Sequence, residues 1–182
     1  MPLSPEDAAQ ALKDVERTQH LTIELRGYEH AAPHFMVWGL VWAFGYALTD
    51  VLPDNRNLIW GIGVVIGTVS SILLGRRGNS ANARFDWRWI AVAATIAAFF
   101  TATSAIMAPL HPRQIDAFIP LVFAVVYIVT GLWLGLRFTL CGVVLGAMTV
   151  LGFFVSGDFF GLWMAVVGGG VLLLTGFWLR TA

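Results

Sequence analysis

The chain has 182 residues, of which 58% are hydrophobic and 12% are charged, and its formal net charge at pH 7 is zero. A soluble domain of this length cannot bury so much apolar surface, so the composition excludes an ordinary soluble globular protein and predicts one surrounded by lipid. The zero net charge, with no basic face, also argues against nucleic-acid binding.

The first 32 residues are predicted to form a cytoplasmic arm that consists mainly of an amphipathic helix. Ser4 and Pro5 suit a helix start, and the chain from there to about Arg26 contains no Gly and no further Pro. Its apolar residues form two short, offset stripes, made first by Ala8, Leu12 and Val15 and then by Leu21, Leu25 and Tyr28.

The arm is acidic, because six Asp and Glu residues stand against three Lys and Arg residues in it. A helix that binds anionic lipid is instead rich in basic residues. Three interpretations of the arm remain open. It is a solvated helix that precedes the first span, it packs on the inner loops of the bundle, or it docks on a cytoplasmic protein partner.

Pro33 follows the arm and is expected to mark the first turn of the first membrane span, so a continuous helix is not expected there. His30 and His34 flank it four residues apart, a spacing that two metal ligands on one helix face would have. No His-Glu-x-x-His pattern accompanies them. Hydrogen bonding at the membrane interface is therefore the favoured role of both histidines.

Six apolar runs follow, each of about 17 residues or more and thus long enough to cross roughly 30 Å of hydrocarbon. They cover about 35–52, 58–74, 89–110, 117–136, 138–155 and 159–179. The fourth and fifth runs are separated by Arg137 alone, where the chain must fold back, because one helix of their joint length would be about twice the membrane thickness. The sequence therefore predicts an all-α membrane protein, with six transmembrane helices in a compact bundle over residues 33–182.

Basic residues are distributed unequally between the two sides of these spans. With the amino terminus inside, nine of the eleven Lys and Arg residues lie in inner segments, and the outer loops hold Arg56 and Arg113. The positive-inside rule then predicts that both termini are cytoplasmic. The first apolar run begins only after about thirty polar residues, so no signal peptide is expected, and in a bacterium the location would be the inner membrane.

Four carboxylates and one imidazole gather at the predicted outer ends of the spans. They are Asp50, Asp54, His111, Asp116 and Asp158. Such groups can ligate metals or act as an acid and base pair, but their spacing matches no metal motif. Ordinary solvated loop tips are the favoured interpretation, and we predict neither a metal nor another cofactor.

Two features inside the spans are candidates for a ligand or pore site. Trp38, Trp42 and Tyr46 follow one another at four-residue intervals and form an aromatic ridge on the first span. Gly168, Gly169 and Gly170 lie near the centre of the sixth span, where the helix either continues and packs tightly or breaks beside a cavity.

Three further glycine pairs predict close helix packing within the bundle or in a homo-oligomer. They are Gly63 and Gly67, Gly131 and Gly135, and Gly142 and Gly146.

Three functions are compatible with the sequence. No ionisable residue lies near the middle of a predicted span, which argues against proton-coupled transport and voltage sensing. We favour a non-enzymatic accessory, regulatory or interaction protein, because of the acidic arm, the glycine-rich faces and the missing catalytic signature.

The alternative is a permease or channel for a small neutral or weakly charged solute. It rests on the triple glycine and on polar positions such as Ser70, Ser71, Thr101, Thr103, Ser104, Tyr127 and Thr130. A third hypothesis is an outer-face enzyme that uses Asp50, His111 or Asp116.

Overall fold

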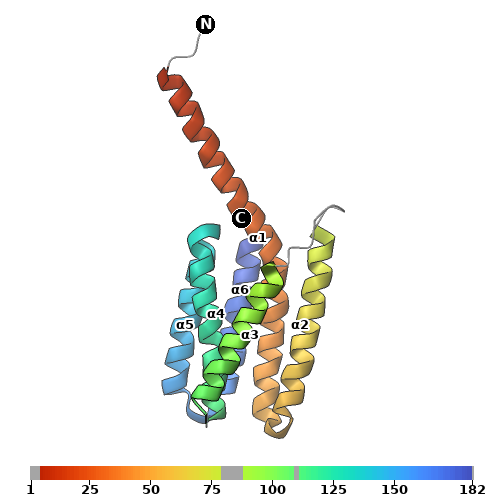
Figure 1. Cartoon of the computed structure of the whole chain (residues 1–182). Helices are drawn as coiled ribbons and strands as arrows, with labels where there is room; N and C mark the ends of the chain where they lie inside the picture. The colour runs from red at the N-terminus through yellow and green to blue at the C-terminus, as the bar shows by residue number, and fades with distance from the viewer. Residues whose placement is uncertain (1–4, 79–87, 109–110, 182) are drawn as a thin grey trace.

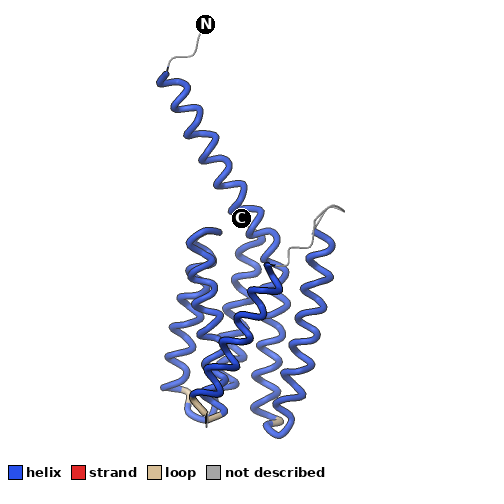
Figure 2. Tube along the Cα trace, in the orientation of Figure 1, coloured by secondary structure: helices blue, strands red, loops and turns tan. Residues whose placement is uncertain are grey.

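Helices form every regular element in the part of the chain that the computed structural model describes, which is residues 5–78, 88–108 and 111–181. The elements are α1 (Pro5–Val51), the 3-10 turn η1 (Pro53–Asn55), α2 (Arg56–Gly78), α3 (Arg88–Ile106), α4 (Pro112–Leu134), α5 (Leu136–Val155), the 3-10 turn η2 (Gly157–Phe159) and α6 (Phe160–Arg180). The helices run roughly along one direction, and the first part of α1 extends well past the others (Figure 1, Figure 2).

Five helical segments are long and apolar enough to cross a membrane. They are Glu24–Val51, Pro53–Gly75, Pro112–Leu134, Leu136–Val155 and Gly157–Arg180. These segments coincide with five of the six predicted spans and are typical of an integral membrane protein. In α3 the described apolar stretch is Ala94–Ile106, which is shorter, so the third span stays a prediction.

The helix break expected at Pro33 is absent. Pro33 lies inside α1, which is one helix of 47 residues. A proline removes one backbone hydrogen bond and crowds the preceding turn, but the adjoining residues Ala32 and Phe35 are buried against other helices. Tertiary packing therefore holds the helix together through a position that local preference would break. The arm and the first span form one continuous helix, whose direction changes where it enters the bundle (Figure 1).

A regular seam of buried residues along α1 organises the bundle. Its members follow one another at alternating intervals of four and three residues, and they are Tyr28, Ala32, Phe35, Gly39, Trp42, Tyr46 and Thr49. This alternation of four and three residues is typical of helices whose side chains insert into the spaces between the side chains of a partner helix. The helix α1 packs most extensively on α6 and less so on α2, while α4 packs mainly on α5.

Small residues allow α1 and α6 to approach closely. A Cβ atom at Gly169 would lie 2.8 Å from the Cβ of Ala43 and 3.0 Å from the Ala43 backbone, and one at Gly39 would lie 2.9 Å from the backbone nitrogen of Leu173. Such distances leave no room for larger side chains. The helix α6 is continuous through all three central glycines, so the break beside a cavity does not occur.

The turn between α4 and α5 is as tight as the sequence suggests. One residue, Gly135, separates the two helices, and its φ of 110° is a conformation that other residues rarely adopt. Gly135 is therefore a turn residue, whereas Gly131 and Gly142 lie where the backbones of α4 and α5 come together. The glycine spacing alone gave no means of separating these two roles.

Replacement of Gly169 by Leu should destabilise the bundle, because the larger side chain would force α1 and α6 apart. We expect the midpoint of thermal unfolding in detergent to fall by roughly 5 °C or more. Gly170→Leu is the matched control, since nothing lies within 4 Å of a Cβ atom at Gly170. Equal midpoints for the two variants would contradict the assigned interface.

Candidate functional site

The structure groups the polar candidates of the predicted outer loops at one end of the bundle. The α1–α2 junction, the start of α4 and the α5–α6 junction lie together at the lower end in Figure 1, whereas the arm, the carboxyl terminus and the α4–α5 turn lie toward the other end. The three segments that the sequence predicts to lie on one side of the membrane are thus at the same end of the bundle. It brings segments that are up to about one hundred residues apart to one surface, where their side chains can meet.

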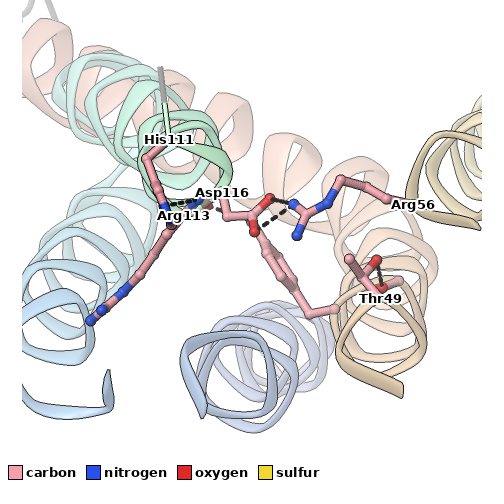
Figure 3. Close-up of polar contacts among 7 residues, drawn as sticks. Thr49, Arg56, His111, Arg113 and Asp116 are labelled. Atoms are coloured by element: carbon pink, nitrogen blue, oxygen red, sulfur yellow. Dashed lines mark hydrogen bonds and ion pairs between the residues drawn. The ribbon is translucent and has the colours of Figure 1, made fainter. Parts of the chain in front are cut away.

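Asp116 is the centre of a connection between three helices at this end. Nη1 of Arg56, at the start of α2, donates to both carboxylate oxygens of Asp116 on α4, at 2.6 and 2.7 Å (Figure 3). The hydroxyl of Tyr46 on α1 donates to the Asp116 carbonyl at 2.8 Å. The side chains of Arg56 and Asp116 are 31% and 14% exposed, so the ion pair is partly shielded from water. Its geometry ties α1, α2 and α4 together.

Asp50 connects the end of α1 to the start of α6. Its Oδ2 accepts a hydrogen bond of 2.7 Å from the backbone nitrogen of Leu162, in the first turn of α6. The first amides of a helix have no partner within the helix, and here a carboxylate from another helix supplies one. A Cβ atom at Gly161 would collide with the Asp50 carboxylate, so this approach requires glycine there.

His111 and Arg113 serve the start of α4. Nδ1 of His111 accepts from the backbone nitrogen of Arg113 at 3.4 Å, and the His111 backbone nitrogen donates to Oε1 of Gln114 at 2.9 Å. Arg113 points away from Asp116 (Figure 3). Its guanidinium lies 5.0 Å and 5.7 Å from the ring centres of Phe153 and Phe160 and donates to the Phe153 carbonyl. Cation–π contact thus joins α4 to the α5–α6 end.

Asp54 and Asp158 are exposed and have no hydrogen bond or ion pair with any residue that the structure describes. Among the described residues, no group of three or more His, Cys, Asp or Glu side chains is arranged to hold a metal ion. The candidates therefore do not form one centre. Asp50, His111 and Asp116 each contact a helix end or a cation, and the chemistry that this arrangement supports is the joining of helix ends.

The aromatic ridge of the first span divides between two surroundings. Trp42 and Tyr46 are buried, and their ring centres lie 5.7 Å from that of Phe123 and 4.9 Å from that of Trp60 respectively. Trp38 faces α2 instead, where its Nε1 donates to Oγ of Ser71 at 3.2 Å. The three side chains fill helix interfaces.

Some candidates of the alternative transport hypothesis also lie in packed surroundings. Tyr127 packs its ring against Phe35, with 4.9 Å between ring centres. Of the three central glycines, Gly168 and Gly169 face other side chains, and Gly170 faces open space.

The arm is the clearest unpartnered surface on the described part of the chain. Four of the described apolar side chains that precede Tyr28 are about half exposed or more: Leu12 (61%), Val15 (51%), Leu21 (51%) and Leu25 (48%). Leu21 and Leu25 precede Tyr28 at the same alternating interval as the buried seam. The seam thus runs beyond the bundle, which the sequence could have shown had the spacing been followed from residue 21 to residue 49.

No match to this chain is found among models of protein families, curated proteins or solved structures. The functional conclusion therefore depends on the geometry of the molecule itself. Two features of the molecule bear on function: the bundle end opposite the arm, where polar groups join helices, and the arm, where apolar groups have no partner among the described residues.

The Arg56–Asp116 ion pair should contribute measurably to stability because it is partly buried. We expect Arg56→Gln and Asp116→Asn each to lower the free energy of unfolding. The double variant should lose less than the sum, with a coupling energy of about 1 kcal/mol or more. Denaturant unfolding in a mild detergent measures the three differences. A coupling energy near zero would show that the pair does not hold α2 against α4.

Proposed function

We propose that this chain is a six-span integral membrane protein that acts by binding, as an accessory or regulatory partner of another protein, and not by catalysis. The observation that carries the proposal is the arm. Its helix continues α1 beyond the bundle, and it presents exposed leucines in register with the buried seam. Of the three interpretations of the arm, this geometry favours docking on a protein partner.

The arm is long enough to reach a partner well outside the bilayer. Residues 5–23 precede the first candidate span, and at 1.5 Å per residue they extend about 30 Å. An isolated helix of this length is only marginally stable in water, so binding that buries its apolar residues would also stabilise its helical form. Each leucine that becomes fully buried contributes about 1.5–3 kcal/mol.

The charge of the arm indicates the chemistry of its partner. Six acidic and three basic residues leave residues 1–32 with a net negative charge. A partner segment that combines basic residues with an apolar stripe complements both properties, in the manner of a helix that binds an amphipathic helix. The partner surface that we propose is therefore a basic, amphipathic segment of a cytoplasmic or membrane protein.

The orientation follows from the distribution of charge. In the predicted order of spans, nine basic residues fall in segments on the side of the arm, and Arg56 and Arg113 fall on the opposite side. We infer that both termini are cytoplasmic and that the third run, 89–110, also crosses the membrane, since an even number of crossings returns the chain to the side where it began.

Cysteine labelling tests this topology. The natural Cys141 is 3% exposed and should not react with a membrane-impermeant maleimide. In intact cells we expect Asp158→Cys to be labelled, and we expect Gln10→Cys and Thr181→Cys to be labelled only after lysis. Labelling of positions 10 and 181 from opposite sides would contradict six spans, and labelling of both from outside would reverse the orientation.

Capture of the partner should depend on the apolar residues of the arm. We expect the double variant Leu12→Asp/Leu21→Asp to lose a bound protein that the unaltered chain retains during affinity purification from native membranes. Gln10→Asp/Thr22→Asp is the control, because it adds the same charge at exposed polar positions of the same helix. High salt should also weaken capture, since the opposite charges are then screened. Equal recovery with both double variants would exclude the apolar surface as the binding determinant.

A further inference from the structure

A cavity of about 670 Å³ lies at the end of the bundle that carries the arm and the carboxyl terminus. It is lined by Leu25, Glu29, Pro33, Met36, Leu179 and Arg180. Its walls therefore come from α1, where the arm meets the first candidate span, and from the last turn of α6. The volume lies in the range of small-molecule sites.

Opposite charges lie on the two walls of this cavity. Glu29 on α1 and Arg180 on α6 are both exposed, and within the described residues neither side chain has a hydrogen bond or ion pair, with each other or with another group. The nearby Arg137 differs, since it donates to the Trp178 carbonyl and lies over the Tyr28 and Trp178 rings. The cavity thus offers one carboxylate and one guanidinium that are free to bind a ligand with both charges.

Pro33 adds a second acceptor on the acidic wall. A proline has no backbone N–H, so the helical hydrogen bond that the Glu29 carbonyl would accept from residue 33 is missing. Glu29 and Pro33 both line the cavity and are four residues apart on one helix, so we place this carbonyl on the same wall. A primary ammonium group carries three donors and can bind the Glu29 carboxylate and carbonyl together.

The remaining described lining is aliphatic and lies near the ends of two candidate spans. Leu25, Met36 and Leu179 supply apolar contacts, and the cavity joins the first residues of the Glu24–Val51 segment to the last residues of Gly157–Arg180. A ligand here would have its polar part at the bilayer surface and its apolar part along the helices. Among the described residues that line the cavity none is aromatic, whereas quaternary ammonium groups are usually bound in aromatic cages.

We propose that this cavity binds a phospholipid with a zwitterionic, primary-amine headgroup, such as phosphatidylethanolamine. Arg180 pairs with the phosphate, the Glu29 carboxylate and carbonyl accept from the ammonium, and the aliphatic residues contact the glycerol and upper acyl chain. Phosphatidylcholine lacks the N–H donors, and the carboxylate repels an anionic headgroup such as phosphatidylglycerol. The lipid is a different ligand from the protein partner proposed above, although Leu25 and Glu29 belong both to the arm and to this cavity.

Native mass spectrometry of the purified, delipidated full chain tests the proposal with phosphatidylethanolamine, phosphatidylcholine and phosphatidylglycerol of the same acyl composition. We expect phosphatidylethanolamine to be retained about fivefold more than either other lipid, which corresponds to about 1 kcal/mol for one charge pair near the membrane surface. Glu29→Gln should remove this preference, and Arg180→Gln should weaken retention of all three lipids. Equal retention of the three lipids by the unaltered chain would overturn the proposal.

Matched controls separate the site from general charge effects. Asp158→Asn and Lys13→Gln make the same charge changes at exposed positions outside the cavity lining and should keep the preference. Met36→Trp should fill the cavity and reduce retention of all three lipids without a change in charge. The arm variant Leu12→Asp/Leu21→Asp should keep the preference for phosphatidylethanolamine. A failure of the partner proposal can therefore be told apart from a failure of the lipid proposal. An unchanged preference in Glu29→Gln would exclude this cavity as the source of selectivity.

Discussion

The close approach of α1 and α6 is the constraint on which the rest of the structure depends. Gly39 and Gly169 lie where the two backbones nearly touch, and even the Cβ of an alanine at either position would force a shift. Because α1 also packs on α2, its position determines where the neighbouring helices can lie. The same contact places Asp50 at the start of α6 and forms the cavity between Glu29 and Arg180.

Polar interactions at the two ends of the bundle serve different purposes. At the end opposite the arm, Asp50, Arg56 and Asp116 pair with other groups and tie helices together. At the end that carries the arm, Glu29 and Arg180 are unpaired within the described residues, and the leucines of the arm are exposed. Charged groups are costly within lipid, so both kinds of interaction lie at the membrane surfaces. The second end therefore carries both proposed binding functions.

Much of the fold could be predicted from local patterns. The apolar runs identified the five helices that are long enough to cross a membrane, and the lone Arg137 indicated the fold-back that Gly135 makes. Pro33 misled the prediction, because local preference argued for a helix end and burial of the neighbouring Ala32 and Phe35 overrides it. The candidate site was predicted less well, since the sequence grouped Asp50, His111 and Asp116 by side of the membrane but could not assign their partners.

The sequence by itself determined the class of the protein, the ends of most helices and the unequal distribution of basic residues, because these depend on hydropathy and spacing along one segment. Only the tertiary structure decided which polar groups are paired and which are available. Arg56 and Asp116 are 60 residues apart in the sequence, and Glu29 and Arg180 are 151 residues apart. Of these two pairs, only Arg56 and Asp116 form an ion pair. The physical reason is that pairing depends on how helices pack side by side, and that packing depends on small residues whose partners lie in distant segments.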